Sequence, residues 1–248
     1  MASVGCNSQS VQKSLVIGSD LSYPPFETIG ESGKAEGVSV DLANALGKKF
    51  GTPVVIENIP FVGLIPALQS GRIDMVISSM TDTEERRKSI TFSDPYLTVG
   101  LALLVNKQSG LMGLEELDQA GRTLVVRQGT TGEVWARATL KQAKILAVER
   151  ESSAVMEVVQ GNADAFVYDQ MSVWENARRH PDSTVAILSP VREERWAIGI
   201  KKGNDELVVQ VNNALGELKA EGFFNQLGEK FLSRQKADFE AQGVPFVF

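Results

Sequence analysis

The sequence predicts an α/β protein of two lobes, in which each lobe is a mostly parallel β-sheet flanked by helices. Short apolar segments of strand length alternate with segments of helical periodicity, as in parallel sheets covered by helices. The alternation runs through residues 14–80 and starts again near residue 121, which favours two similar units over one long sheet. The chain has 248 residues, enough for two lobes that each bury a core.

The first unit has the order strand, helix, strand, helix, strand. Apolar runs bounded by Gly, Asp or Pro predict the strands. Val38, Leu42, Ala45 and Leu46 share one face of the first predicted helix, and Gly51 follows its end. The predicted elements are the strand 14–20, the helix 37–51, the strand 53–59, the short helix 61–71 and the strand 72–79.

The second unit repeats this order, and a helical tail follows it. Leu207, Val211, Leu215 and Leu218 form an apolar stripe at helical spacing in the tail. The predicted strands are 121–129, 144–150, 163–169, 184–189 and 195–203. The predicted helices are 130–142, 151–162 and 170–180, with one or two more over 205–232.

The spacing of these elements also predicts how the chain divides into domains. No low-complexity or Pro-rich linker separates the lobes, so we interpret "TVGLA" near residues 98–102 as part of a hinge with two strands. The first lobe is then discontinuous. We expect a flexible leader over 1–13, lobe 1 over 14–98 and 194–248, and lobe 2 over 99–193.

Composition excludes several classes of function. The net charge of -6 and the pI of about 5.0 leave no basic surplus for nucleic-acid binding. A single cysteine and a single histidine exclude an internal disulfide and a Cys/His metal site, so we expect no metal and no cofactor. No apolar run approaches the roughly 20 residues that span a bilayer.

The single cysteine lies near the start of the chain. "VGC" before a Ser/Gln-rich stretch resembles the cleavage end of a bacterial lipoprotein signal, which would leave a lipid-bearing Cys6 as a membrane tether. The apolar region that should precede such a site is missing. An incidental cysteine in a disordered leader is the alternative.

The stretch "SSMTDTEERRKSITFSDPY" contains the first candidate site. Ser78, Ser79 and Thr81 follow a predicted strand, at the end where ligands bind in open α/β sheets. Thr81 or Thr83 can cap the short helix that "TEERRK" begins, and Arg86 lies one turn on. A guanidinium fits a carboxylate as a two-pronged fork. Taken alone, the charged run favours a solvated helix face over a ligand grip.

Two further candidates lie in the second unit. "VRQGTTGE" places Thr130 and Thr131 at a strand-to-helix turn, where exposed N–H groups attract an anion. Asp169 ends the apolar strand "ADAFVYD", where a buried carboxylate needs a partner such as an ammonium group. An ordinary capped helix explains each feature equally well.

The fourth candidate is "GSDLSYPPFE", after the first strand. Asp20 can accept hydrogen bonds from an amide, ammonium or guanidinium, and Tyr23 and Phe61 can flank a side chain. Either aromatic alone fits plain core packing. An anion grip, a cation grip and an aromatic slot together describe a free α-amino acid.

On these residues the sequence resembles the polar amino-acid-binding proteins of bacterial ABC importers, the periplasmic type II class of solute-binding family 3 that binds Lys/Arg/ornithine, His or Gln. The resemblance runs from about residue 14 to about 232 and rests on "IGSDLSYPPFE", "GVSVDLANALGKKFG", "FVGLIPALQSGRIDMVISSMTDTEERRKSITFSDPY", "QGTTGE" and "YDQ". It implies a monomer whose two lobes close over one amino acid and deliver it to a membrane permease, on the periplasmic or extracellular face of the membrane.

The resemblance also assigns roles to residues. It implies that Arg86 holds the ligand carboxylate with Thr81 and the Thr131 N–H, and that Asp169 holds the ammonium with help from Ser79 and Thr81. Tyr23 and Phe61 would flank the side chain, whose polar end meets Asp20. Arg87 and Lys88 would then be solvated neighbours of Arg86.

The side-chain specificity and the reaction class stay open. Asp20 with two aromatics resembles the basic amino-acid binders, whereas Arg127 stands where glutamine binders place a lysine. An Arg127 that lines the pocket disfavours an arginine ligand, while one that points outward permits it. A few relatives, such as cyclohexadienyl dehydratases, are enzymes. We expect no catalytic residue here and keep a dehydratase as the alternative, with Glu27 as the one surplus carboxylate.

Overall fold

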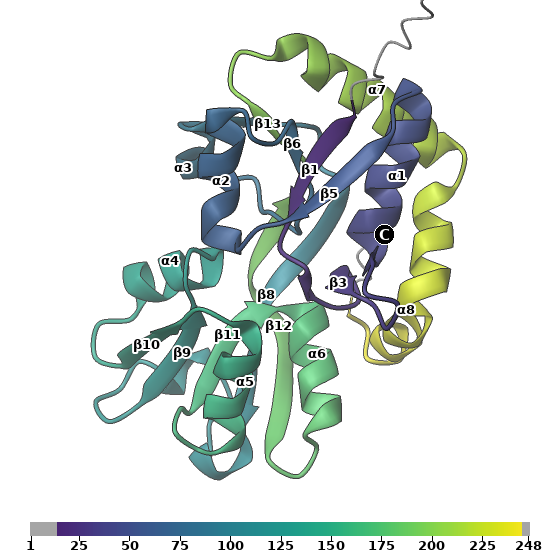
Figure 1. Ribbon diagram of the computed structural model, residues 1–248. Helices are drawn as coiled ribbons and strands as arrows, with labels where there is room; N and C mark the ends of the chain where they lie inside the picture. The colour runs from purple at the N-terminus through teal and green to yellow at the C-terminus, as the bar shows by residue number, and fades with distance from the viewer. Residues whose placement is uncertain (1–13, 245–248) are drawn as a thin grey trace, which may run out of the picture.

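The computed structural model describes residues 14–244 and contains two five-stranded sheets, one in each lobe (Figure 1). In each sheet three neighbouring strands run parallel and the other pairings are antiparallel. The first sheet has the order β5 (Val54–Asn58), β1 (Leu15–Ser19), β6 (Met75–Val76), β13 (Gly199–Lys201) and β7 (Ile90–Phe92). The second has the order β10 (Lys144–Val148), β9 (Thr123–Arg127), β11 (Ala165–Asp169), β8 (Leu97–Asn106) and β12 (Thr184–Trp196).

Helices cover both faces of each sheet. In the first lobe α1 packs on α7 and α8 over one face of the sheet. On the other face α2 packs on β1 and β13. The helices of the first lobe are α1 (Val38–Phe50), α2 (Phe61–Ser70), α3 (Glu84–Arg87), α7 (Asp205–Ala220) and α8 (Phe223–Ala241). Those of the second are α4 (Thr131–Thr139), α5 (Glu151–Val159) and α6 (Gln170–Arg179).

Smaller elements complete the fold. A three-stranded sheet follows β1 and is built from β2 (Ser22–Tyr23), β3 (Glu27–Ile29) and β4 (Ala35–Glu36). Two short 3₁₀ helices, Lys107–Ser109 and Leu114–Glu116, lie between β8 and β9. Gly51 ends α1 in the left-handed conformation, as its place after the apolar stripe predicts.

Two long strands connect the lobes. β8 and β12 pair antiparallel from Leu97–Trp196 at one end to Asn106–Thr184 at the other. Trp196 also forms a bridge with Thr81, which belongs to the first lobe. The segment "TVGLA" lies inside the continuous strand β8. The pairing of β8 with β12 shifts its register once, at an irregularity between Ile187 and Arg192.

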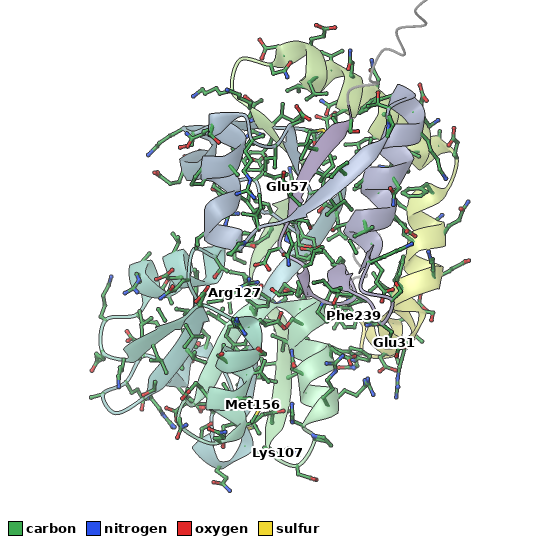
Figure 2. All side chains as sticks on the ribbon, viewed as in Figure 1. Glu31, Glu57, Lys107, Arg127, Met156 and Phe239 are labelled. Carbon is green, nitrogen blue, oxygen red and sulfur yellow. The ribbon has the colours of Figure 1, made fainter. Side chains whose placement is uncertain are left out.

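The C-terminal helix extends further than the apolar pattern predicts. α8 continues to Ala241 instead of ending near 232. Phe239 is fully buried, and its ring meets the edge of Trp174 in α6, with 6.5 Å between the ring centroids. Because α6 belongs to the second lobe, this end of α8 packs against both lobes (Figures 1 and 2). Cys6 lies outside the described residues.

Candidate functional site

A small cavity lies between the lobes, at the carboxyl ends of β1, β6, β9 and β11. Its volume is about 40 Å³, which suffices for only a few water molecules. Hydrogen bonds from Arg86 to Gly129 and from Arg127 to Asp20 join the two lobes across it, so the cleft is closed. All the residues that the sequence predicts as ligand-binding line it: Asp20, Tyr23, Phe61, Ser78, Ser79, Thr81, Arg86, Arg127, Thr130, Thr131 and Asp169. The other lining residues are Glu27, Leu101, Gly132, Tyr168, Glu194 and Trp196.

Arg86 reaches the cavity from the short helix α3. The hydroxyl of Thr83 caps this helix by accepting a hydrogen bond from the Arg86 N–H at 3.2 Å. The guanidinium donates from Nη1 to the Thr81 carbonyl at 2.7 Å and from Nη2 to the Gly129 carbonyl, in the other lobe, at 3.0 Å. Burial lowers the pKa of Arg86 to about 10, and it stays charged at neutral pH.

The neighbours of Arg86 face solvent. Arg87 pairs with Asp82, and Lys88 pairs with Glu85 at 2.5 Å. More than half of the Arg87 and Lys88 side-chain surface is exposed. The run "EERRK" thus combines one side chain directed into the cleft with a solvated face.

Arg127 lines the cavity and forms an ion pair across it with Asp20. Nη2 of Arg127 donates to the Asp20 carboxylate, and Nη1 donates to the Tyr168 hydroxyl at 3.0 Å. Burial alone would lower the pKa of Arg127, but Tyr168 and Asp20 raise it above its ordinary value. Figure 2 shows Arg127 where the two lobes meet. Since Asp20 already has a cationic partner, it is not a free anion for a basic side chain in this form.

Phe61 lies against both cations of the cleft. The guanidinium carbons of Arg86 and Arg127 are 5.3 Å and 5.6 Å from its ring centroid, within the range of a cation–π interaction. Its backbone N–H donates to Asp20 Oδ2 at 3.0 Å. Phe61 therefore contacts the charged groups of Arg86, Arg127 and Asp20.

Asp169 caps a helix and also lies in the lining of the cavity. Oδ1 accepts hydrogen bonds from the N–H groups of Met171 and Ser172, both at 3.0 Å, and so caps α6. The residue also lines the cavity. Burial raises its pKa to about 6, although contact with the Tyr23 hydroxyl and the α6 N–H groups lowers it. Capping uses one oxygen and leaves the carboxylate able to bind a cation.

The aromatic wall around Tyr23 is continuous. Tyr23 stacks on Phe26 at 5.3 Å and meets the edges of Tyr168 and Trp196 at 5.8 Å and 6.1 Å. Its buried hydroxyl makes no hydrogen bond of normal geometry within residues 14–244. Tyr23 is thus both a core residue and a lining residue, with its polar end beside Asp169.

Glu27 is a buried carboxyl in the lining of the cavity. It accepts hydrogen bonds from the hydroxyls of Ser39 at 2.6 Å, Ser79 at 3.0 Å and Ser78 at 3.3 Å. Burial raises its pKa to about 8, so it is largely protonated at neutral pH. Ser79 has a φ of 47°, an uncommon conformation for a residue with a side chain, and its bond to Glu27 helps to hold this turn.

Glu194 is a second carboxyl that the candidate-site prediction missed. It lies on β12, is 4% exposed, and accepts hydrogen bonds from the hydroxyls of Thr81 and Thr131, both at 2.8 Å. It also pairs with Arg192. Spacing gives one signal for it: Glu194 and Trp196 are two residues apart on a strand and so share a face. The charged run "REER" hides that signal.

The donor set fits a small zwitterion. Arg86 has more N–H groups than its two bonds to carbonyls use, and the first turn of α4 adds backbone N–H groups beside it. Asp169 adds a carboxylate to the lining of the same cavity. Within residues 14–244 no group of His, Cys, Asp and Glu is arranged to hold a metal ion, and no helix is long and apolar enough to cross a membrane.

Comparison with known proteins identifies similar chains over the same region. The family model of the bacterial extracellular solute-binding proteins, family 3, matches residues 15–234. The L-cystine-binding protein TcyJ of Escherichia coli (strain K12) is 28% identical over 218 residues, which cover 88% of this chain and 82% of that protein.

Two solved structures show the same fold at higher identity. One is the ancestral amino acid-binding protein AncCDT-1, a precursor of cyclohexadienyl dehydratase, with a TM-score of 0.81 and 38% identity over 88% of this chain and 94% of that one. The other is an ancestral arginine-binding protein bound to glutamine, with a TM-score of 0.80 and 35% identity over 88% and 97%.

Proposed function

Because the chain belongs to the bacterial extracellular solute-binding proteins of family 3, we propose that it captures a polar L-amino acid between its lobes and delivers it to an ABC importer. The observation that carries this proposal is the convergence of Arg86, the α4 N-terminus and Asp169 on one cavity. A guanidinium with helix N–H groups and a carboxylate in one cavity match the carboxylate and ammonium of an α-amino acid.

The head groups of the ligand would bind as follows. The α-carboxylate accepts hydrogen bonds from Arg86 and from the first turn of α4, and the α-ammonium pairs with Asp169. These groups come from both lobes, so a bound ligand stabilises the closed form over an open one.

The Arg127–Asp20 pair favours an amide side chain over a basic one. A cationic side chain at this point would meet Arg127 and compete with it for Asp20. A carboxamide can donate to Asp20 and accept from Arg127 at once, without leaving either charge unpaired. We therefore propose L-glutamine as the preferred ligand, with L-arginine and L-lysine binding more weakly. A related arginine-binding scaffold holds glutamine in its solved structure.

A thermal-melt panel tests this function. The ligands are L-Gln, L-Arg, L-Lys, L-His, L-Glu and L-Asp, each at millimolar concentration. A ligand at about 1,000 times its Kd stabilises the fold by roughly 4 kcal/mol, which raises Tm by several degrees. We expect the largest rise with L-glutamine. If none of the six raises Tm, the amino-acid proposal is wrong.

Arg86 and Arg87 provide a matched pair of variants for the same panel. Arg86→Ala removes the anion grip, and we expect it to raise the Kd about 100-fold or more. Arg87→Ala removes an exposed cation of the same helix and should leave the Kd nearly unchanged. Equal losses in the two variants would contradict the assignment of Arg86.

The enzyme alternative has a separate readout. We propose that the protein is not an enzyme, because Arg86 and Asp169 are intact and fit ligand binding. Glu27 is nevertheless a protonated carboxyl in the wall of the cavity. Consumption of prephenate or arogenate by the purified protein, lost in Glu27→Gln, would establish a dehydratase instead.

The family description supports a place outside the cytoplasm. We propose that it acts outside the cytoplasm as a monomer, and that Cys6 carries a lipid that tethers it to the membrane. Mass spectrometry of the protein from its native membrane, before and after Cys6→Ser, tests the tether.

A further inference from the structure

We propose that Glu194 is a specificity residue: a tethered carboxylate that competes with the ligand's α-carboxylate at the anion grip. This inference rests on the proposed function, because it assigns a role to Glu194 in the same cavity. It concerns the affinity for the ligand, and whether the cavity prefers a charged α-carboxylate or a neutral group in its place.

The contacts of Glu194 support the inference first. Its Oε2 accepts hydrogen bonds from the hydroxyls of Thr81 and Thr131, each at 2.8 Å. Thr81 belongs to the first lobe and Thr131 begins α4 of the second, so one carboxylate bridges both walls of the closed cleft. These two threonines are the ones expected beside the carboxylate of a bound amino acid. In this closed form a carboxylate of the protein itself engages both hydroxyls.

The charge of Glu194 supports it next. The residue is 4% exposed, and its charge raises the pKa of Arg86 against the larger effect of burial. Glu194 therefore already compensates part of the positive charge of Arg86, which the ligand carboxylate would otherwise compensate. A ligand carboxylate at Arg86 must either displace Glu194 from the threonines or lie beside it as a second buried anion. Both arrangements weaken binding.

Arg192 supplies the position to which Glu194 can withdraw. The Arg192 guanidinium pairs with Oε1 of Glu194, and 40% of the Arg192 side-chain surface is exposed. When Glu194 releases the threonine hydroxyls, it keeps this charged partner near the solvent-exposed edge of β12. Displacement therefore does not leave the carboxylate unpaired, and the competition is reversible.

The test compares Glu194→Gln with Glu193→Gln by titration calorimetry. Glu193 is the adjacent residue, and its side chain is 68% exposed. Both variants remove one negative charge, but only Glu194→Gln removes it from the cavity. The probes are L-glutamine and L-arginine, together with L-glutaminamide and L-argininamide, in which a neutral amide replaces the α-carboxylate. We expect Glu194→Gln to bind the amino acids on the order of tenfold more tightly. The amides should gain less, and Glu193→Gln should leave all four affinities unchanged.

Each outcome decides the question. Weaker or unchanged amino-acid binding by a folded Glu194→Gln would show that Glu194 positions the threonines instead of competing, and would overturn the inference. If Glu194→Gln does not fold, Arg192→Gln replaces it and should weaken amino-acid binding, because Glu194 then loses its alternative partner. If neither amino acid binds the unaltered protein, the preference for L-glutamine is wrong, and the comparison is made with the amino acid of the six that raises Tm and with its amide. If none of the six binds, the proposed function itself fails and the inference falls with it.

Discussion

Single residues of the cleft combine a structural contact with a place in the cavity lining, and Asp169 is the clearest example. One carboxylate oxygen caps α6 through Met171 and Ser172, which fixes the side chain at the end of β11. The same residue lines the cavity. The sequence alone presents these roles as alternatives, because a cap and an ammonium partner both need an aspartate at a strand-to-helix turn. In the structure the cap holds this carboxylate at the end of β11, in the lining of the cavity.

The raised pKa of Asp169 predicts how ligand affinity depends on pH. Its pKa of about 6 lies above the ordinary value because of burial, and the ligand's ammonium needs the charged form. As pH falls through 6, protons compete with the ligand, so the Kd should rise by up to tenfold per pH unit.

Calorimetric titrations of one amino acid from pH 8 to pH 5 measure this dependence. Asp169→Asn keeps an N-capping side chain but no charge, so it should bind weakly with a flat pH profile. An affinity of the unaltered protein that stays constant to pH 5 would rule out Asp169 as the ammonium partner.

Glu27 predicts an effect of pH on stability in the unliganded protein. Its pKa is about 8 in the folded state and 4.5 ordinarily, so the folded state retains a proton that the unfolded state has lost. Stability is therefore greatest below pH 4.5 for this group, and it declines as pH rises through 8.

Urea unfolding at intervals from pH 5 to pH 8 measures this slope. Glu27→Gln retains the shape and the bonds from the serine hydroxyls, so its slope should be shallower. Glu151 and Asp169 also have raised pKa values, of about 7 and 6, and keep part of the dependence. Parallel slopes for the two proteins would show that Glu27 is not the source.

At the scale of elements, local patterns predict helices and parallel strands well but not the partners that long-range pairing selects. The strand predicted over 184–189 continues to Trp196, because β8 supplies a pairing partner for the charged segment "VREERW". Nothing local marks β13 as antiparallel to β6 and β7. The missed residues Glu194 and Trp196 lie on that extension of β12, whereas the predicted ones follow strand ends that apolar runs identify.

The C-terminal end of α8 predicts a large contribution to stability. Phe239 is fully buried and touches Trp174 of the second lobe. Phe239→Ala should lower the free energy of unfolding by about 3–5 kcal/mol, because it removes a large side chain from a packed site. Val209→Ala, at a 58% exposed position of α7, should change it by less than about 0.5 kcal/mol. Similar urea midpoints for both variants would show that this end of α8 does not stabilise the fold.

At the scale of the whole molecule, both polar and apolar contacts join the two lobes. Arg127 pairs with Asp20, Arg86 donates to the Gly129 carbonyl, and Glu194 accepts from a hydroxyl of each lobe. The largest apolar cluster of the described residues is also continuous between the lobes, and it includes Tyr23 and Trp196 of the cavity lining. We expect the polar contacts to be the ones that break when the lobes separate, because they exchange with water at modest net cost.

A crystal structure of the complex with the amino acid that gives the largest melt shift tests the central claim most directly. We predict a ligand in the cavity between the lobes, with its carboxylate on Arg86 and the first turn of α4, and its ammonium on Asp169. A ligand bound elsewhere, or one whose ammonium and carboxylate are reversed in this cavity, would contradict the account.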